Sequence, residues 1–322
     1  MKRFAFLFVC TGLFFNLAAC ATHPEPPGKM VAVDGHLMHL YCTGPESPQP
    51  TVILEGANMG LSPFYRNLQE SLEQTIRVCS YDRAGIAWSE PSDNPRESRF
   101  IAAELHELLR EAGLKPPFLL AGHSLGGLFV LRYAHDYPDE VAGLALLDAS
   151  HPDQNTLVAD PAKQIAGELK ILAWLRRLQW LGVSHVYNPY RVQLQPLPPA
   201  AFEQALYFTH QPSMADAIIG ETRSRIVSMA QAGEVKTLGA LPLLVVSAGA
   251  YQVNPERSAE DTERLKTSYE RWQQFHLQYL ALSTNSRHVV IEGSNHYTLI
   301  SNKQFAQRAS DEIIKLANAP RQ

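Results

Sequence analysis

Ser124 lies in a five-residue segment bounded by glycines, Gly122 to Gly126, whose surroundings suit a nucleophile. A strand-like apolar run at residues 118–121 precedes the segment, and an amphipathic run at residues 128–137 follows it. A sharp turn from strand to helix holds a serine hydroxyl clear of the backbone, where a base can reach it. The first turn of the helix also leaves N–H groups unpaired, and these can bind a developing negative charge. The segment therefore predicts nucleophilic catalysis by Ser124.

The longer run Gly-His-Ser-Leu-Gly-Gly, residues 122–127, resembles the nucleophile elbow of the α/β-hydrolase family. A second segment, residues 81–89, resembles the Asp-x-x-Gly-x-Gly-x-Ser loop of the same family, with Ala87 in place of one glycine. The resemblance covers roughly residues 31–318, apart from a central insertion that carries no specific motif. It implies that a base, an orienting acid and an oxyanion site surround the serine.

The resemblance implies that the base lies in the loop after the last strand of the sheet. That strand is predicted at residues 287–291, and the loop Gly293-Ser294-Asn295-His296-Tyr297 follows it. His296 is therefore the predicted base. Other histidines lie at less suitable positions, one of them inside the elbow: His123, His151, His276 and His288.

The resemblance allows the acid at two places, after the strand before the insertion or after the strand beyond it. The later strand leads into residues 247–254, which contain no carboxylate. The earlier strand ends at Asp148, at the edge where a doubly wound sheet concentrates its functional groups. A carboxylate there can bond the imidazole N–H and stabilise the imidazolium. We therefore predict Asp148 as the acid, with Glu256 and Asp261 as alternatives and a turn-capping role as the structural alternative for Asp148.

The predicted oxyanion hole uses two backbone N–H groups. One belongs to Leu125, the residue after the serine, and the other to Ala57, in the turn after the strand at residues 51–54. Many members of the family carry His-Gly in that turn, whereas this chain carries Glu55-Gly56. Because the donor is a backbone group, the change leaves the prediction in place and suggests a structural role for Glu55.

Apolar runs and helical patterns alternate along most of the chain, which predicts an α/β fold with a doubly wound, mostly parallel sheet. An opening hairpin is predicted within residues 31–41, broken at Asp34-Gly35. Further strands are predicted at residues 51–54, 76–80, 118–121, 141–147, 241–246 and 287–291. Helices are predicted at residues 64–72, 99–112, 128–137 and 304–318.

Between residues 152 and 239 this alternation stops, and aromatic residues and prolines become frequent. We interpret the stretch as a helical cap inserted into a core formed by residues 31–151 and 240–322. Aromatic rings in such a cap can line an apolar pocket or pack on one another, and the sequence leaves both interpretations open.

The first residues match an export signal. Lys2-Arg3 precede an apolar run of about fourteen residues, too short to span a bilayer, and small residues lead to Cys20. Because this pattern resembles a bacterial lipobox, we predict a signal peptide at residues 1–19, lipidation of Cys20 and a tether at residues 20–30. A secretory signal with an incidental cysteine is the alternative. Ala21 favours the outer membrane of a bacterial cell envelope over the inner one.

Two further cysteines, Cys42 and Cys79, lie in strand-like runs that the resemblance makes neighbours in the sheet. Export would place them in an oxidising compartment, where a disulfide between them is possible. Two buried free thiols are the alternative.

The net charge of −4, with no basic run, argues against a nucleic-acid partner. No metal-ligand spacing or dinucleotide fingerprint is present, so no cofactor or metal is expected. We expect a lipid-anchored serine hydrolase that cleaves small or medium apolar esters through an acyl-enzyme. Serine at the elbow argues against haloalkane or epoxide hydrolysis, for which related members use a carboxylate. Peptidase, thioesterase and carbon–carbon hydrolase activities stay open, as does a non-catalytic binding module on a surface lipoprotein.

Overall fold

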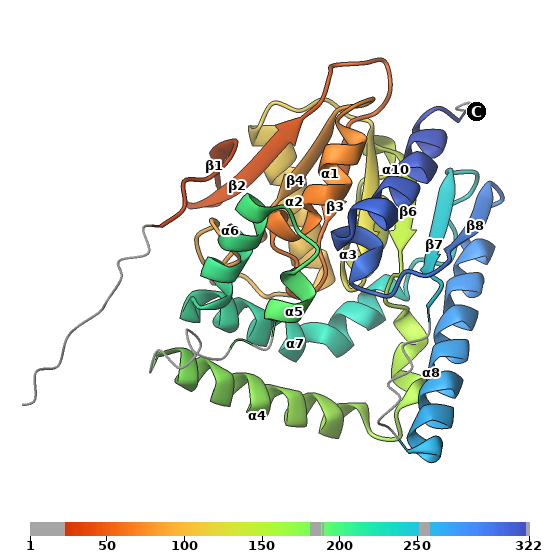
Figure 1. The fold of residues 1–322 in the computed structure, drawn as a ribbon. Coiled ribbons are helices and arrows are strands. Elements are labelled where there is room, and N and C mark those ends of the chain that lie inside the picture. Colours follow the sequence, from red (N-terminus) through yellow and green to blue (C-terminus); the bar gives the residue numbers. More distant parts are fainter. Residues whose placement is uncertain (1–22, 181–187, 189, 251–257, 320–322) are drawn as a thin grey trace, which may run out of the picture.

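The computed structural model describes residues 23–180, 188, 190–250 and 258–319, arranged around one eight-stranded sheet (Figure 1). The spatial order of the strands is β1-β2-β4-β3-β5-β6-β7-β8. Their bounds are β1 (Lys29–Val33), β2 (His36–Thr43), β3 (Val52–Glu55), β4 (Val78–Tyr81), β5 (Phe118–His123), β6 (Val141–Leu147), β7 (Leu243–Ala248) and β8 (Ser286–Ile291). β1 pairs with β2 and β2 with β4 in antiparallel register, and all pairs from β4 to β8 are parallel. The predicted fold class is confirmed.

The opening hairpin turns at Asp34-Gly35, as its sequence pattern predicts. Both residues adopt left-handed backbone conformations, with φ of 45° at Asp34 and 86° at Gly35. Two such residues form the turn whose twist matches that of the flanking strands, and Val33 pairs directly with His36 across it.

Helices cover both faces of the sheet and bury an apolar layer on each. The layer on one face contains side chains of α1, α9 and α10, and the layer on the other contains side chains of α2 and α3. The helices of the core are α1 (Arg66–Leu72), α2 (Ser98–Glu111), α3 (Gly126–Asp136), α8 (Ala259–Gln278), α9 (Thr298–Ser301) and α10 (Lys303–Ala317), with the short 3-10 helices η1 (Ser62–Tyr65), η2 (Pro138–Glu140) and η5 (Tyr279–Leu282). The sequence analysis did not predict α8, which connects β7 to β8.

The predicted insertion is a group of helices between β6 and β7. Its elements are η3 (Pro152–Leu157), α4 (Pro161–Trp180), α5 (Arg191–Leu194), α6 (Pro199–Thr209) and α7 (Pro212–Ala232). They lie beside the carboxyl ends of the parallel strands, and α4 forms the outermost layer (Figure 1). A cap-like helical insertion is therefore present, as predicted. Among the helices that the structure describes, none is both long and apolar enough to cross a membrane.

The chain from His23 to Gly28 lies against the body of the protein. The carbonyl oxygen of Pro24 accepts a hydrogen bond of 2.7 Å from the indole Nε1 of Trp88, and that of Pro27 contacts the ring of His39. β1 begins at Lys29, so the segment predicted as a tether over residues 20–30 already contains the first strand residues. Cys20 and the predicted signal peptide lie outside the described residues.

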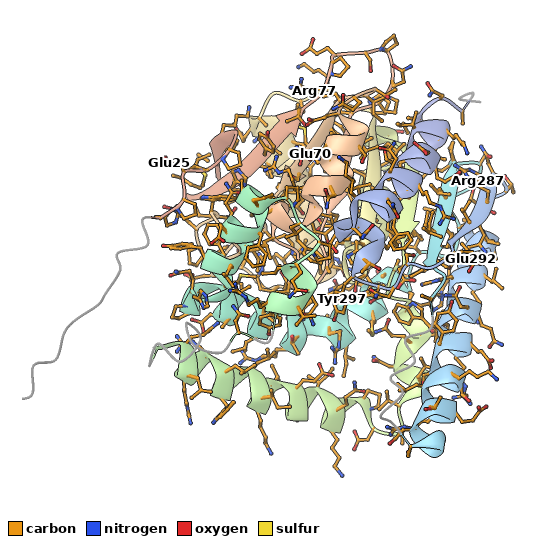
Figure 2. All side chains as sticks on the ribbon, viewed as in Figure 1. Glu25, Glu70, Arg77, Arg287, Glu292 and Tyr297 are labelled. Atoms are coloured by element: carbon orange, nitrogen blue, oxygen red, sulfur yellow. A yellow bond between two sulfur atoms is a disulfide. The ribbon has the colours of Figure 1, made fainter. Side chains whose placement is uncertain are left out.

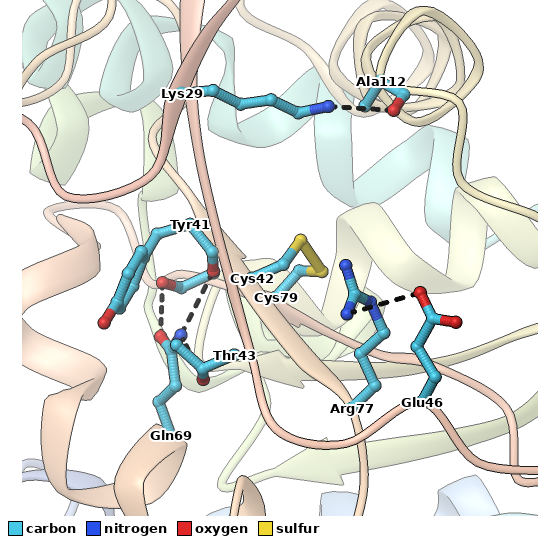
Figure 3. The surroundings of a disulfide bond; sticks show 10 residues. Lys29, Tyr41, Cys42, Thr43, Glu46, Gln69, Arg77, Cys79 and Ala112 are labelled. Carbon is cyan, nitrogen blue, oxygen red and sulfur yellow. Dashed lines mark hydrogen bonds and ion pairs between the residues drawn. A yellow bond between two sulfur atoms is a disulfide. The ribbon is translucent and has the colours of Figure 1, made fainter.

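Cys42 and Cys79 form a disulfide between β2 and β4 (Figure 3). The two residues are directly opposite each other in the antiparallel register. Cys79 is fully buried in the apolar layer beneath the sheet, whereas Cys42 borders a cavity of about 670 Å³. This cavity is lined by residues that precede β3 and β5, so it lies at the amino ends of the parallel strands.

Reduction of the disulfide should lower the free energy of unfolding by about 3–4 kcal/mol, since the closed loop spans 37 residues. The measurement is urea unfolding of oxidised wild-type protein against a double variant, Cys42→Ala with Cys79→Ala. Equal unfolding midpoints for the two proteins would show that the bond does not stabilise the fold.

Candidate active site

Ser124 occupies the sharp turn between β5 and α3. Its backbone has a φ of 55°, in the left-handed region that non-glycine residues rarely adopt. The turn packs tightly against the end of β3, because a Cβ atom on Gly126 would lie 2.5 Å from the carbonyl oxygen of Gly56. Glycine at position 126 therefore permits the approach that brings the two loops together.

The structure brings Ser124, His296 and Asp148 together, from three loops at the carboxyl ends of the parallel strands. The Nε2 atom of His296 lies 3.0 Å from Oγ of Ser124, and its Nδ1 atom lies 2.6 Å from Oδ2 of Asp148. His296 follows β8, and Asp148 follows β6. The imidazole thus has one nitrogen toward a hydroxyl and the other toward a carboxylate, as a general base with an orienting acid requires.

Asp148 is held from several sides. Its Oδ1 atom accepts a hydrogen bond of 3.0 Å from the N–H of Ala248, at the end of β7. Burial alone would raise the pKa of Asp148, but the hydrogen bond and charge of His296, with smaller contributions from His276 and Ala248, lower it to about 2. The carboxylate is therefore ionised at any pH at which the protein is expected to work.

Of the two alternative acids, the structure describes Asp261, whose carboxylate bonds Ser258 and Arg264. Asp261 lies in the first turn of α8, where its N–H bonds Oγ of Ser258 at 3.1 Å and its carboxylate pairs with Arg264 at 3.1 Å. Its side chain is 49% exposed. Glu256 lies outside the described residues.

Ser247, His276 and His288 form a hydrogen-bonded cluster next to Asp148 that the sequence did not predict. Both histidines lie at positions unsuited to the catalytic base. Oγ of Ser247 lies 2.7 Å from Nδ1 of His276 and 2.8 Å from Nε2 of His288. The other nitrogen of His276 lies 3.1 Å from the carbonyl oxygen of Ala149. His276 therefore holds the backbone of Ala149, the residue after Asp148. Only the tertiary contact of α8 with β6 and β7 creates this cluster, and no local pattern signals it.

The two predicted oxyanion donors differ in their present hydrogen bonds. Leu125 directly precedes α3, so its N–H is one of the donors that a helix start leaves unpaired. The N–H of Ala57, in contrast, already donates a hydrogen bond of 2.7 Å to the hydroxyl of Tyr65. In this state the N–H of Ala57 is therefore occupied, and its role as an oxyanion donor stays a prediction. The cause is a tyrosine eight residues away, which the local sequence of the turn does not reveal.

Tyr65 and His123 form a directed chain of hydrogen bonds beside the serine. Nε2 of His123 lies 2.9 Å from the carbonyl oxygen of His296, which can only accept, so Nε2 carries the proton. Burial, reinforced by the charge of His296, lowers the pKa of His123 to about 3, so the ring stays neutral. Its unprotonated Nδ1 then accepts the O–H of Tyr65 at 3.0 Å. The hydroxyl proton therefore points away from the site, and the oxygen covers the N–H of Ala57.

The stability of the protein should fall on acidification because several buried histidines stay neutral in the folded chain. Burial lowers the pKa of His123 to about 3, that of His151 to about 4 and that of His276. The unfolded chain binds these protons near pH 6.5, so stability present above that pH is lost as pH drops below it. His123 alone contributes about 2 kcal/mol of this loss by pH 5.

Urea unfolding at pH 7 and pH 5 measures this loss. The unfolding midpoint of wild type should fall between the two values, and that of His123→Asn should fall less, because asparagine does not titrate. A wild-type midpoint that is the same at both pH values would contradict the prediction.

Arg83, in the loop after β4, connects the loop after β3, which contains Gly56 and Ala57, to α7 of the cap. The guanidinium donates to the carbonyl oxygens of Gly56 at 2.9 Å and Ala57 at 2.6 Å. It also pairs with Glu55 at 2.6 Å and with Glu221 of α7 at 2.7 Å, and all three charged side chains are almost fully buried. Burial raises the pKa of Glu55, and the charge of Arg83 opposes this rise. Glu55 is thus a structural partner, as its position suggested.

Two cavities lie near this site, one lined by His296 and the other by Ala57 and His123. The first, of about 440 Å³, is lined by Asp148, His296 and mainly apolar or aromatic side chains, among them Leu157, Tyr269 and Trp272. The second, of about 90 Å³, is lined mainly by apolar side chains, among them Ala57, Met59, Leu61, Phe64 and Leu194. Tyr297 lines both cavities and is labelled in Figure 2, where it lies close to α5. Within the described ranges, no three His, Cys, Asp or Glu side chains lie close enough together to hold a metal ion.

Comparison with known proteins agrees with this architecture. Residues 50–303 match the family model of the alpha/beta hydrolase fold, so the chain belongs to that family. YbdG of Bacillus subtilis is 29% identical over 44% of this chain and 43% of its own length. The bovine (lyso)-N-acylphosphatidylethanolamine lipase is 28% identical over 45% of this chain and 44% of its own. The chain thus spans less than half the length of the first curated relatives it matches.

Solved structures share the fold at low sequence identity. ALR0039 from Nostoc sp PCC 7120 superposes with a TM-score of 0.67 over 89% of this chain and 97% of its own, with 15% identity. At this identity the likeness concerns the fold alone.

Proposed function

We propose that this protein is a serine hydrolase that cleaves carboxylic esters through an acyl-enzyme intermediate. The observation that carries the proposal is the chain of contacts from Oγ of Ser124 to Nε2 of His296 at 3.0 Å and from Nδ1 of His296 to Asp148 at 2.6 Å. A serine hydroxyl becomes nucleophilic when an adjacent base removes its proton, and the base works when a third group orients it.

In the proposed reaction, His296 takes the proton of Ser124 as Oγ attacks the ester carbonyl carbon. The ionised carboxylate of Asp148 stabilises the imidazolium that forms. The imidazolium then gives its proton to the oxygen of the departing alcohol, and the acyl group stays on Ser124. A water molecule, deprotonated by His296, attacks the acyl carbon in the second half. Release of the acid returns the proton to Ser124.

The oxyanion of the tetrahedral intermediate would bind first to the N–H of Leu125. We propose that the N–H of Ala57 becomes the second donor only when the substrate carbonyl oxygen displaces the hydroxyl of Tyr65. Removing that competitor in Tyr65→Phe should therefore leave kcat/KM within about tenfold of wild type. A loss of more than about 100-fold would instead assign the Tyr65 hydroxyl itself to the transition state.

The substrate is proposed to be an ester of a small or medium apolar acid. The small cavity beside Ala57 is apolar and limits the acyl group, whereas the larger cavity beside His296 can hold the alcohol portion. The name of the bovine relative, a lipase, agrees with an acyl ester as the bond that is cleaved. A series of p-nitrophenyl esters should show faster turnover for short acyl chains than for long ones.

A fluorophosphonate probe, which reacts with activated serines, tests the class of the protein. Labelling should occur in wild type and disappear in Ser124→Ala. An unlabelled wild type that binds acyl esters without cleaving them would instead make the protein a binding module. Labelling together with turnover of peptides or thioesters, but not of esters, would reject the ester bond and keep the serine mechanism.

We also propose that the protein is exported and lipid-anchored at Cys20 in a bacterial cell envelope, at the outer membrane. Cys20→Ala should then yield protein that lacks the acyl chains and is poorly processed or no longer retained by the lipid anchor. Mass spectrometry of the amino-terminal peptide and membrane fractionation measure both effects. An unchanged mass and unchanged fractionation would reject the lipid anchor.

A further inference from the structure

The outer face of α4 combines exposed basic and apolar side chains, and the basic ones have no ion-pair partner in the part of the chain that the structure describes. Ile171 and Trp174 are 61% and 57% exposed, although large apolar side chains are usually covered. Lys163, Lys170 and Arg177 are also exposed and form no ion pair with any side chain that the structure describes. α4 is the outermost layer of the cap (Figure 1).

The spacing of these five residues places them on one side of the helix. At about 100° per residue, the three basic positions, which are seven residues apart, fall within an arc of about 40°. Trp174 lies beside them and Ile171 at the margin, so the whole set covers about 120°. The opposite side faces α7, where Ile165 is buried. The one carboxylate within α4, that of Glu168, is turned toward Arg225 of α7 at 2.8 Å. Within α4 the outer face therefore carries only positive charge, and the exposed Asp160, which accepts a hydrogen bond of 2.9 Å from the N–H of Lys163, lies just before the helix.

We infer that the outer face of α4 docks on the surface of an anionic phospholipid bilayer. A helix that lies in the membrane interface presents lysine and arginine toward the lipid headgroups and a tryptophan or aliphatic side chain toward the acyl chains. Each basic residue near an anionic surface contributes to the attraction, and the three basic residues on this face outnumber the single carboxylate of Asp160 beside it.

The course of the amino-terminal segment would place the proposed lipid anchor on the cap side of the protein. The ring of His23 contacts the rings of Tyr207 and Phe208 in α6. The adjoining carbonyl oxygen of Thr209 accepts a hydrogen bond of 2.8 Å from Gln179, near the carboxyl end of α4. Cys20 precedes His23 by three residues, which span about 10 Å at most. A lipid on Cys20, which belongs to the proposed function, would therefore hold the cap, and not the far edge of the sheet, against the bilayer.

Fluorescence of Trp174 in vesicles tests the inference. The full-length protein is mixed with phosphatidylcholine vesicles that carry brominated acyl chains, with and without phosphatidylglycerol. The difference between wild type and Trp174→Phe isolates the emission of Trp174. We expect quenching in vesicles that contain phosphatidylglycerol, and weaker quenching in neutral ones. No quenching in the anionic vesicles would overturn the inference, and so would self-association of the protein through α4 that leaves Trp174 unquenched.

Two matched triple variants test whether membrane partitioning depends on the basic residues of α4 or only on the net charge of the protein. Lys163→Glu, Lys170→Glu and Arg177→Glu together should weaken partitioning of Trp174 into anionic vesicles by about 100-fold. The control, Lys115→Glu, Lys266→Glu and Lys303→Glu, changes three exposed lysines outside α4 and alters the net charge equally, so it should retain partitioning within about tenfold. An equal loss in both variants would reject a specific face. Hydrolysis of a soluble p-nitrophenyl ester by both variants checks that the fold is intact.

The same experiment distinguishes the failure of this inference from the failure of the proposed anchor. Protein that floats with the vesicles but shows unquenched Trp174 is anchored without docking through α4. Protein that lacks acyl chains on Cys20 but shows quenched Trp174 docks through α4 without an anchor.

Discussion

Ser124→Ala should lower the turnover of p-nitrophenyl esters by about 10⁴- to 10⁶-fold while leaving the fold intact. The hydroxyl is the group that forms the acyl bond, and its loss removes no buried apolar contact. Steady-state kinetics on a short-chain ester measure the effect, and thermal unfolding checks that the variant is folded.

Ser268→Ala provides the matched control, because Ser268 also lines the cavity beside His296. Its hydroxyl donates to the carbonyl oxygen of Arg264 at 3.0 Å and contacts no histidine in the described residues. This variant should keep nearly all activity. Residual turnover of Ser124→Ala within about tenfold of wild type would exclude Ser124 as the nucleophile.

Asp148→Asn should lower turnover by about 10³- to 10⁴-fold. An amide at this position offers an N–H or a neutral oxygen to His296, so the imidazole loses the charge that stabilises its protonated form and adopts the wrong tautomer. Because the pKa of Asp148 is lowered to about 2, the carboxylate should not itself titrate in the pH–rate profile of wild type above pH 4. The measurement is kcat/KM for the variant and wild type across that pH range.

Asp261→Asn is the matched control, since it removes the same charge from the other carboxylate that the sequence offered. Its side chain bonds Ser258 and Arg264 at the start of α8, so activity should change little. Full activity in Asp148→Asn together with an inactive Asp261→Asn would reverse the assignment of the acid.

Local sequence patterns were sufficient to name the three side chains that the structure brings together. Ser124 stands in a short motif between a strand and a helix, and Asp148 and His296 each follow a strand of the predicted sheet. In a parallel sheet the carboxyl ends of neighbouring strands share one edge, so side chains that follow different strands converge there. The order of the strands, which decides which of them are neighbours, comes from the family resemblance.

The parts that sequence reasoning missed depend on contacts between distant segments. The hydroxyl that covers the N–H of Ala57 belongs to Tyr65, whose orientation depends on His123 at the end of another strand. The cluster formed by Ser247 and His276 requires α8 to lie against β7. α8 itself was missed although Ser258 caps its first turn, because its apolar positions are sparse among charged residues.

The buried ion pair of Arg83 with Glu221 fixes α7 of the cap against the core. The helices before it, α4 to α6, are the part of the cap that can be exchanged. Swinging α7 away from the sheet would remove one of the two carboxylates that pair with the buried Arg83 guanidinium. The segment from α4 to α6 is connected to α7 by ion pairs nearer the surface, such as Arg176 with Asp216. Substitution of residues 161–209 by the equivalent segment of a relative should therefore keep the hydrogen bonds of Arg83 to Gly56 and Ala57, while it exchanges side chains such as Leu194 that line the cavity beside Ala57.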